Sequence, residues 1–140
     1  MTWASGSRWR QQNLTYDFCV VYNIHMKTPT FGQYVRERRE ALRKTDRAYT
    51  VRQVALRLGI QGAYLSKVER EEVAPPGEGT IVKLAGELGE DADFLLALAG
   101  KVATDLREVI IARPVLMARL LRGLRDLPDA DVEKLVLWKR

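Results

Sequence analysis

Residues 50–70 read TVRQVALRLGIQGAYLSKVER, and this stretch decides the fold. Thr50 can cap a helix whose apolar residues share one face, and Gly59 ends that helix. A second helix follows at once, because the apolar pattern resumes directly after the glycine. Ala55 is small enough to let the two helices cross closely, and Gly59 relieves the strain of the turn between them. The stretch therefore predicts two short helices joined by one glycine-containing turn.

The second of these helices, expected around residues 63–70 and extending to about Glu71, has two different faces. The inner face is predicted to be buried through three apolar residues, Ile60, Leu65 and Val68. The outward face then holds Gln61, Gly62, Ala63, Ser66, Lys67 and Arg70. Small residues at the start of this helix would let its N-terminus approach base edges or phosphates. The outward face is therefore a candidate surface for reading DNA.

Apolar spacing and capping residues predict further helices on both sides of this stretch. A first helix begins behind Thr30, ends near Lys44 and carries Phe31, Val35, Ala41 and Leu42. Residues 45–49 contain turn residues without periodicity, and residues 75–77 form a Pro-Pro-Gly loop. A fourth helix ends at Gly89, and a fifth runs from the cap at Asp91 to Gly100. Because no strand pattern interrupts residues 30–100, the predicted class is all-α with five helices.

Residues 101–140 predict a helical C-terminal extension. One helix opens at Thr104, a second has Pro114 in its first turn, and a third covers residues 128 to about 138. The second helix is unusually apolar, with Val115, Leu116, Met117, Leu120, Leu121 and Leu124. This surface is wider than one narrow stripe, which indicates burial against something in addition to the five-helix core. Homodimerisation is favoured over simple capping of the N-terminal domain, because DNA readers of this kind usually work as pairs.

Residues 1–26 form an N-terminal tail with scattered aromatic residues, a short apolar run at 18–22 and no capping pattern. Our hypothesis is that Met26 is the native start and that residues 1–25 derive from an upstream start codon. The other interpretation is that the tail forms a strand or an arm at a dimer interface. The chain has one cysteine, Cys19, and one histidine, His25. Neither a disulfide framework nor a Cys/His metal site can therefore form within one chain, and no cofactor is expected.

Charge is distributed unevenly along the chain. Residues 27–70 contain eleven Lys/Arg and four Asp/Glu, whereas residues 71–100 contain one Lys and seven Asp/Glu. The basic block is typical of a polyanion binder, although a solvated helix face gives the same pattern. No apolar run approaches the roughly 18 to 20 residues that span a bilayer, so we expect a cytoplasmic protein without a membrane partner. No catalytic triad, P-loop or dinucleotide turn is present, so we expect no enzyme and no catalytic residue.

Over residues 30–100 the sequence resembles the lambda-repressor and Cro-like helix-turn-helix family, known as the XRE family of bacterial regulators. The resemblance rests on ordered motifs: FGQYVRERRE at 31–40, the spacing from Ala55 to Gly59, GIQGAYLSKVER at 59–70, APPGEGTIVKLAGELG at 74–89 and DFLLALAG at 93–100. It implies a DNA-binding domain over residues 27–100. The implied function is sequence-specific regulation of transcription on double-stranded DNA, as a repressor that acts as a homodimer through the major groove.

The resemblance also implies roles for single residues. It pairs Arg39 with Glu69 across the first and third helices, in a structural ion pair that orients the reading helix. Ser66 and Lys67 are implied to face the groove, and two further residues to contact or approach the DNA backbone, Arg52 and Tyr64.

The sequence also departs from the family pattern. Val51 stands where many members have a phosphate-binding glutamine, Gly62 and Ala63 replace longer polar residues, and the loop before Thr50 is longer than the commonest form. These departures affect the identity of the base contacts. The alternative function is an antitoxin-like module that grips a protein partner through residues 101–140 and uses the helix-turn-helix only for autoregulation.

Overall fold

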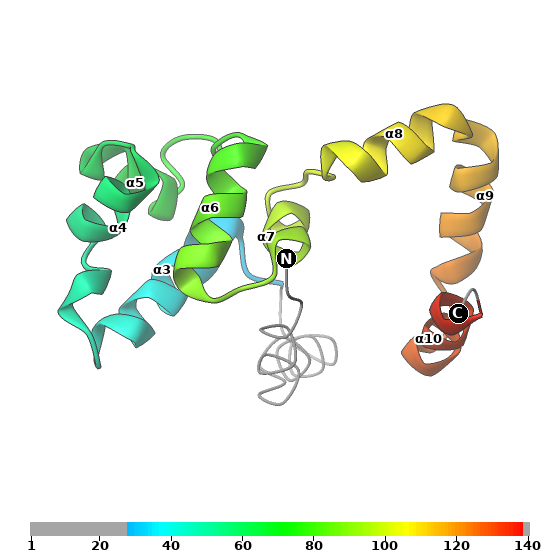
Figure 1. Ribbon diagram of the computed structural model, residues 1–140, viewed down its shortest axis with the longest axis horizontal. Coiled ribbons are helices and arrows are strands. Elements are labelled where there is room, and N and C mark those ends of the chain that lie inside the picture. Colours follow the sequence, from blue (N-terminus) through cyan, green and yellow to red (C-terminus); the bar gives the residue numbers. More distant parts are fainter. Residues whose placement is uncertain (1–27, 139–140) are drawn as a thin grey trace. The chain divides into compact units, whose positions relative to one another are not determined.

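The computed structural model describes residues 28–138, which are helical and contain no strand, so the predicted all-α class is confirmed. The chain divides between Lys101 and Val102 into two compact units. The tail hypotheses, the run at 18–22, Cys19 and His25 lie outside the described residues. The first unit contains α3 (Phe31–Arg43), the 3-10 helix η2 (Arg47–Tyr49), α4 (Val51–Leu58), α5 (Gly62–Glu69), α6 (Glu78–Leu88) and α7 (Ala92–Leu98). Figure 1 labels these five α-helices. The second unit contains α8 (Thr104–Ala112), α9 (Pro114–Leu124) and α10 (Asp129–Leu137).

The helix ends follow from short-range side-chain chemistry. The hydroxyl of Thr30 accepts a hydrogen bond from the backbone N–H of Gln33 at 3.3 Å, and the Gln33 side chain accepts one from the Thr30 N–H at 3.3 Å. This reciprocal capping box satisfies two N–H groups at the start of α3. Gly59 and Gly89 adopt positive φ angles of 71° and 66° after α4 and α6, as glycine does at helix C-termini. The predicted N-caps whose side chains accept a backbone hydrogen bond are Thr30, Thr50 and Asp91.

The core of the first unit is built from one face of each of its five α-helices. α4 packs against α5, α6 packs against α7, and α3 contacts α5, α6 and η2. The Tyr34 ring meets the Phe94 ring edge to face, with centroids 5.0 Å apart. Two residues expected in the core are not fully buried. Ala41, on the predicted apolar face of α3, is exposed, and Ile60, before α5, is only half-buried. The buried apolar residues are Phe31, Tyr34, Val35, Val54, Ala55, Leu58, Leu65, Val68, Ile81, Leu84, Ala85, Leu88, Leu95 and Leu96.

Gly32 allows the start of α3 to lie directly against the end of α5. A Cβ atom at this position would lie 2.4 Å from the carbonyl oxygen of Val68 and 3.1 Å from that of Glu69. Both obstacles are backbone atoms, which a side-chain rotation cannot move. The close packing of α3 on α5 therefore requires glycine here.

The end of α5 differs from the sequence prediction. The helix ends at Glu69 rather than near Glu71, and Glu71 adopts a positive φ of 62°. Two backbone hydrogen bonds close the turn. The Glu71 N–H donates to the Val68 carbonyl at 3.1 Å, and the Glu72 N–H donates to the Lys67 carbonyl at 2.9 Å. This is the Schellman arrangement, in which a left-handed residue follows the last helical turn. A glutamate gives no signal for such a turn, which explains the error.

The second unit forms no buried core within residues 102–138. None of its described residues, 102–138, is buried, although α9 and α10 are rich in leucine and valine. On α9 the exposed fraction is 67% for Val115 and 55% for Leu121. Helices with this much apolar surface gain little from folding alone, because burial supplies most of the stability of a short helix.

Candidate nucleic-acid interface

The helix α5 presents one buried face and one exposed face, as its sequence predicted. Leu65 and Val68 point into the core and are 1% and 2% exposed. Gln61, Ala63, Lys67 and Arg70 are exposed, whereas Gly62, Tyr64 and Ser66 are half-exposed. The outward face of α5 is therefore open along its whole length and carries few bulky side chains at its start. We call the set formed by Gln61, Gly62, Ala63, Tyr64, Ser66, Lys67 and Arg70 the α5 face.

A buried ion pair joins α5 to α3. The Nε of Arg39 donates to Oε1 of Glu69 at 2.7 Å, and Nη2 donates to Oε2 at 2.9 Å. Both side chains are almost fully buried, at 3% and 4% exposed. A two-pronged contact of this kind fixes orientation as well as distance. The structure thus places together the two residues that the resemblance paired, and their geometry fixes the direction of α5.

The Arg39 guanidinium also has contacts beyond Glu69. Its Nη1 donates to the backbone carbonyl of Tyr49 at 3.1 Å, and its Nη2 donates to Oε1 of Glu40 at 2.9 Å. The hydrogen bond with Glu69 raises the pKa of Arg39 above its ordinary value, against the opposing effect of burial. The hydrogen bond from Arg39 likewise lowers the pKa of Glu40. Arg39 therefore stays charged and satisfied inside the domain.

The start of α4 lies beside the start of α5. A Cβ atom on Gly62 would lie 3.7 Å from the Cα atom of Arg52, an ordinary contact distance. Arg52 is exposed in the first turn of α4, behind the cap at Thr50. Two helix N-termini and one arginine thus share one edge of the unit. Helix N-termini attract anions, because their unpaired N–H groups carry partial positive charge.

The cations of this surface differ in their partners. Arg70 forms an exposed ion pair with Glu72, with Nε and Oε1 3.1 Å apart. Lys67 and Arg52 form no ion pair with any residue of 28–138. A cation that already has an acidic neighbour must give up that neighbour before it binds a phosphate or a base. Within residues 28–138 this cost falls on Arg70 and not on Lys67 or Arg52.

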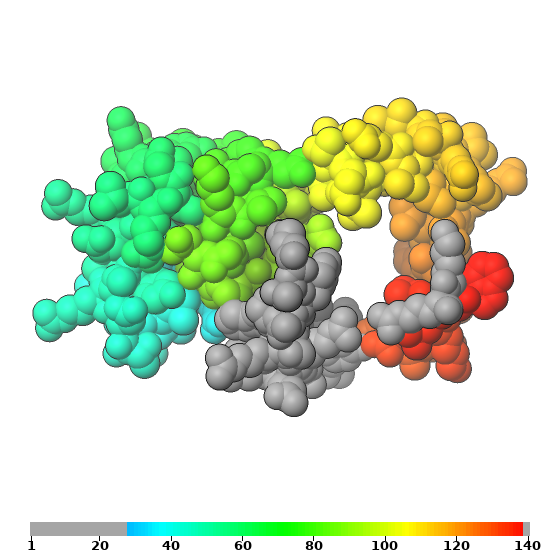
Figure 2. Space-filling view, viewed as in Figure 1, coloured from blue at the N-terminus to red at the C-terminus, as the bar shows by residue number. Residues whose placement is uncertain are grey.

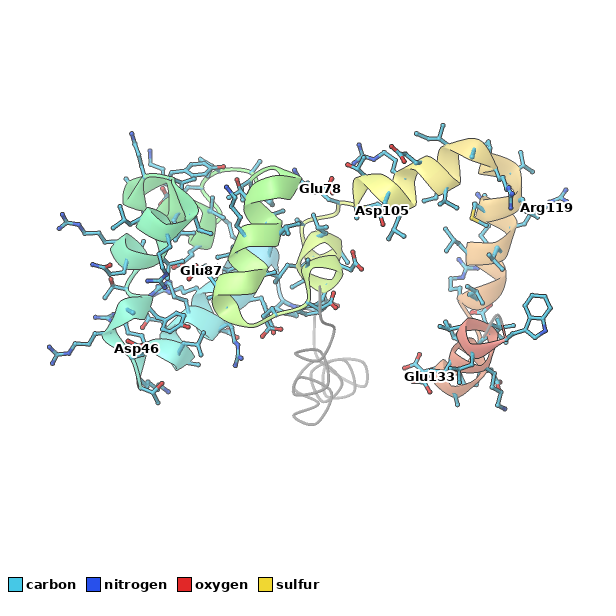
Figure 3. All side chains as sticks on the ribbon, in the orientation of Figure 1. Asp46, Glu78, Glu87, Asp105, Arg119 and Glu133 are labelled. Atoms are coloured by element: carbon cyan, nitrogen blue, oxygen red, sulfur yellow. The ribbon has the colours of Figure 1, made fainter. Side chains whose placement is uncertain are left out.

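The sequence did not reveal the structure of the segment before α4. Its composition predicts a turn over residues 45–49, but residues 47–49 form the 3-10 helix η2. The Asp46 carboxylate accepts a hydrogen bond from the Ala48 N–H at 2.8 Å and caps this helix. Figure 3 labels Asp46 at the turn between α3 and α4. The sequence signal for this turn was Asp46 itself, because an aspartate side chain often accepts a hydrogen bond from the backbone N–H two residues later.

Side chains of the segment from α3 to α5 project from one edge of the first unit, as Figure 2 shows in cyan and green. No group of three or more His, Cys, Asp or Glu residues within 28–138 could hold a metal ion. No helix in that same part of the chain is long and apolar enough to cross a membrane. The open α5 face, its two-pronged support and the adjoining α4 N-terminus define a helix-turn-helix DNA-binding unit.

Comparison with known proteins agrees with this assignment. The helix-turn-helix family model matches residues 36–95, which run from α3 into α7. The uncharacterized HTH-type transcriptional regulator RghRB of Bacillus subtilis (strain 168) is 38% identical over 111 residues, an alignment that covers 74% of this chain and 76% of the relative. No solved structure matches the chain significantly. The chain belongs to the XRE family of helix-turn-helix transcriptional regulators, a class of DNA-binding proteins and not of enzymes.

Proposed function

We propose that this protein is a repressor that binds specific sites on double-stranded DNA as a homodimer, in the cytoplasm where the DNA lies. The observation that carries the proposal is the α5 face, which is open to solvent while a buried ion pair fixes the helix behind it. A helix held in this way can enter the major groove, where each base pair presents a distinct pattern of donors and acceptors. A bound dimer of this size would act by occupying its site and excluding the polymerase.

Within this interface, Lys67 and Arg52 are proposed to have different tasks. Lys67 lies on the α5 face and can reach a guanine edge, whereas Ser66 is shorter and contributes only where the helix lies close to the groove wall. Arg52 lies in the first turn of α4, where a DNA backbone phosphate would meet a helix N-terminus. Tyr64 is proposed to approach the backbone. Gln61 and Arg70 are the remaining candidate readers on the α5 face.

The second unit is proposed to join the two copies. Its apolar residues are exposed within 102–138, so an isolated copy leaves this surface in water. Its helices also differ in charge: α9 contains Arg119 and Arg122 without an acidic residue, whereas α10 contains Asp129, Asp131 and Glu133 together with one basic residue, Lys134, which pairs with Asp131 at 3.2 Å. If a two-fold axis places α9 of one copy against α10 of the other, the contact forms twice, and apolar burial and the difference in charge then favour the same partner. This complementarity favours a second copy over a foreign protein.

Selection of bound sites from random DNA tests the proposal directly. We expect an inverted repeat with half-sites centred about 10 base pairs apart, one turn of the duplex. Lys67→Ala should weaken the selected site by about 1 to 3 kcal/mol and relax the preference at one base pair per half-site. Arg52→Ala should weaken all sequences alike and lower the salt dependence by about one unit per half-site. Recovery of no common sequence would refute specific binding, and activation of transcription from the selected site would refute repression.

Sedimentation of the full chain and of a form that lacks residues 102–140 tests the dimer. The truncated protein should stay folded, because its core residues all lie between 31 and 96. It should sediment as a monomer and lose most of its affinity for the inverted repeat. A truncated protein that remains dimeric would place the interface elsewhere. A full-length protein that is monomeric, and associates only with the product of a neighbouring gene, would favour the antitoxin-like function instead.

A further inference from the structure

The connection between α3 and α4 is an ordered element held by two arginines. The Nη1 of Arg57, on α4, donates to the Ala48 carbonyl at 2.8 Å, and its guanidinium lies 5.4 Å from the centroid of the Tyr49 ring. The Nε of Arg57 donates to Oε2 of Glu87 on α6 at 2.5 Å, so Arg57 is itself anchored. Figure 3 labels Glu87 on α6. The η2 backbone is therefore fixed to the domain and is not a free loop.

The same guanidinium that orients α5 also holds η2. Arg39 binds Glu69 of α5 through Nε and Nη2, and binds the Tyr49 carbonyl of η2 through Nη1. Both elements are thus placed by one buried group. Figure 1 shows the connection between α3 and α4 at the same edge of the first unit as α4 and α5. A contact made from η2 would therefore keep a fixed offset from contacts made by the α5 face.

Arg47 is the cation that η2 presents. Its side chain is exposed and forms no ion pair or hydrogen bond with any residue of 28–138, and the carboxylate of its acidic neighbour Asp46 accepts a hydrogen bond from the Ala48 N–H instead. Its backbone carbonyl accepts a hydrogen bond from the Thr50 N–H at 3.4 Å, which connects η2 directly to the start of α4. Arg52, the proposed phosphate contact, lies two residues beyond Thr50. An arginine without a partner among residues 28–138 thus lies next to the α4 N-terminus on a rigid support.

We propose that η2 extends the DNA interface and that Arg47 binds a backbone phosphate beside the phosphate bound by Arg52. The inference rests on the proposed docking of α5 in the major groove. A guanidinium offers several N–H donors to phosphate oxygens, and a backbone that is already ordered loses little entropy when it binds. A contact to phosphate carries no sequence information, so Arg47 adds affinity and fixes the position of the domain on the duplex. The longer loop before Thr50 would then be a functional addition.

The test compares three full-length variants on the selected operator and on random DNA. Arg47→Ala removes the proposed contact, Arg47→Lys keeps its charge, and Lys83→Ala is the control, because Lys83 is an exposed cation on α6 without an ion pair in 28–138. Titrations at several salt concentrations should show that Arg47→Ala weakens both DNAs by the same factor. It should also lower the slope of log affinity against log salt by about 0.9 for each phosphate that is no longer neutralised. Arg47→Lys should keep most of the slope, and Lys83→Ala all of it.

Ethylation of single phosphates locates the contact. With the wild-type protein, ethylation should interfere at one phosphate per half-site whose effect disappears in Arg47→Ala. An unchanged slope and interference pattern in Arg47→Ala, alongside weakened binding in Lys67→Ala, would overturn the role of Arg47 and leave the proposed function standing. Equal slope changes in Arg47→Ala and Lys83→Ala would also overturn it, because the effect would then be general charge. Failure to select any operator would count against the proposed function itself.

Discussion

Replacing Glu69 by alanine should damage the folded state before it damages any DNA contact. The change removes both acceptors of the two-pronged pair and strands the Arg39 guanidinium, which is only 3% exposed. In the variant, Nη1 of Arg39 still donates to the Tyr49 carbonyl and Nη2 still donates to Glu40, but Nε has lost its acceptor. Breaking a buried pair from one side costs about 3 kcal/mol of the free energy of unfolding. For a domain of this size that corresponds to a fall in melting temperature of about 12–24 °C.

Two matched variants separate the buried pair from charge in general. Glu40→Ala removes the half-exposed partner of the same guanidinium and should cost only about 0–1 kcal/mol. The double variant with methionine at positions 39 and 69 removes both charges and should recover much of the loss, because no buried charge is left without a partner. The coupling between the two single changes to methionine, measured as a double-mutant cycle, is the energy of the pair in this protein.

Urea unfolding and thermal melts of the full chain measure the stability loss, and DNA titrations below the transition measure binding. We expect the binding of Glu69→Ala to fall in step with its folded fraction. A melting temperature that does not change while binding disappears would refute the reasoning, because Glu69 would then act at the DNA. A double methionine variant less stable than Glu69→Ala would equally show that the loss is not due to a stranded charge.

Three further changes test the packing around α5 and the buried carboxyl group of Glu90, which pairs with Arg38 of α3. Gly32→Ala should lower the free energy of unfolding by about 1–3 kcal/mol, because its Cβ would collide with the Val68 carbonyl oxygen. A melting temperature equal to that of the wild type would show that α3 can move away from α5 at little cost. Glu71→Gly should raise the free energy of unfolding by about 0.5–1 kcal/mol, because glycine adopts the positive φ of this position without strain. Urea unfolding measures this, and a lower midpoint than in the wild type would contradict it. Burial raises the pKa of Glu90 above its ordinary 4.5, and this outweighs hydrogen bonding from Tyr34 and the charge of Arg38. The folded protein therefore binds this proton more tightly than the unfolded chain, and the stability it contributes is complete below pH 4.5 and is lost as the pH rises through the raised pKa. Glu90→Gln should thus gain stability relative to the wild type as the pH is raised above 4.5 in urea titrations, and a relative loss would mean that the ion pair with Arg38 dominates.

The five-helix order of residues 30–100 followed from periodicity and caps, since those signals are local. Thr30, Thr50 and Asp91 each cap a helix with their own side chain, and Gly59 ends one with a positive φ. Such features depend on a few neighbouring residues, so a sequence shows them directly. The exposed and buried faces of α5 were also readable, because burial repeats with the period of the helix.

The features that the sequence concealed depend on residues far apart in the chain. Gly32 looks like an unfavourable glycine near a helix start, and only the carbonyl of Val68 against it shows why it is needed. The order in η2 comes from Arg39 and Arg57, which lie on other helices and whose targets are backbone carbonyls without a sequence signature. Ala41 fits the apolar period of α3, but it stays exposed to solvent among the described residues.

The absence of a buried core within residues 102–138 has a consequence for how such a regulator would respond to its own abundance. If α8, α9 and α10 are covered only when two copies meet, their order is gained at the moment of pairing, and dilution removes both together. The amount of protein able to fill an operator then rises with the square of the amount synthesised, as long as single copies predominate. Lone copies would also expose leucine-rich helices to proteases, which shortens their lifetime. A modest change in synthesis of the protein would become a much larger change in operator occupancy. The exposed leucines of α9 would in this way set a threshold concentration for repression.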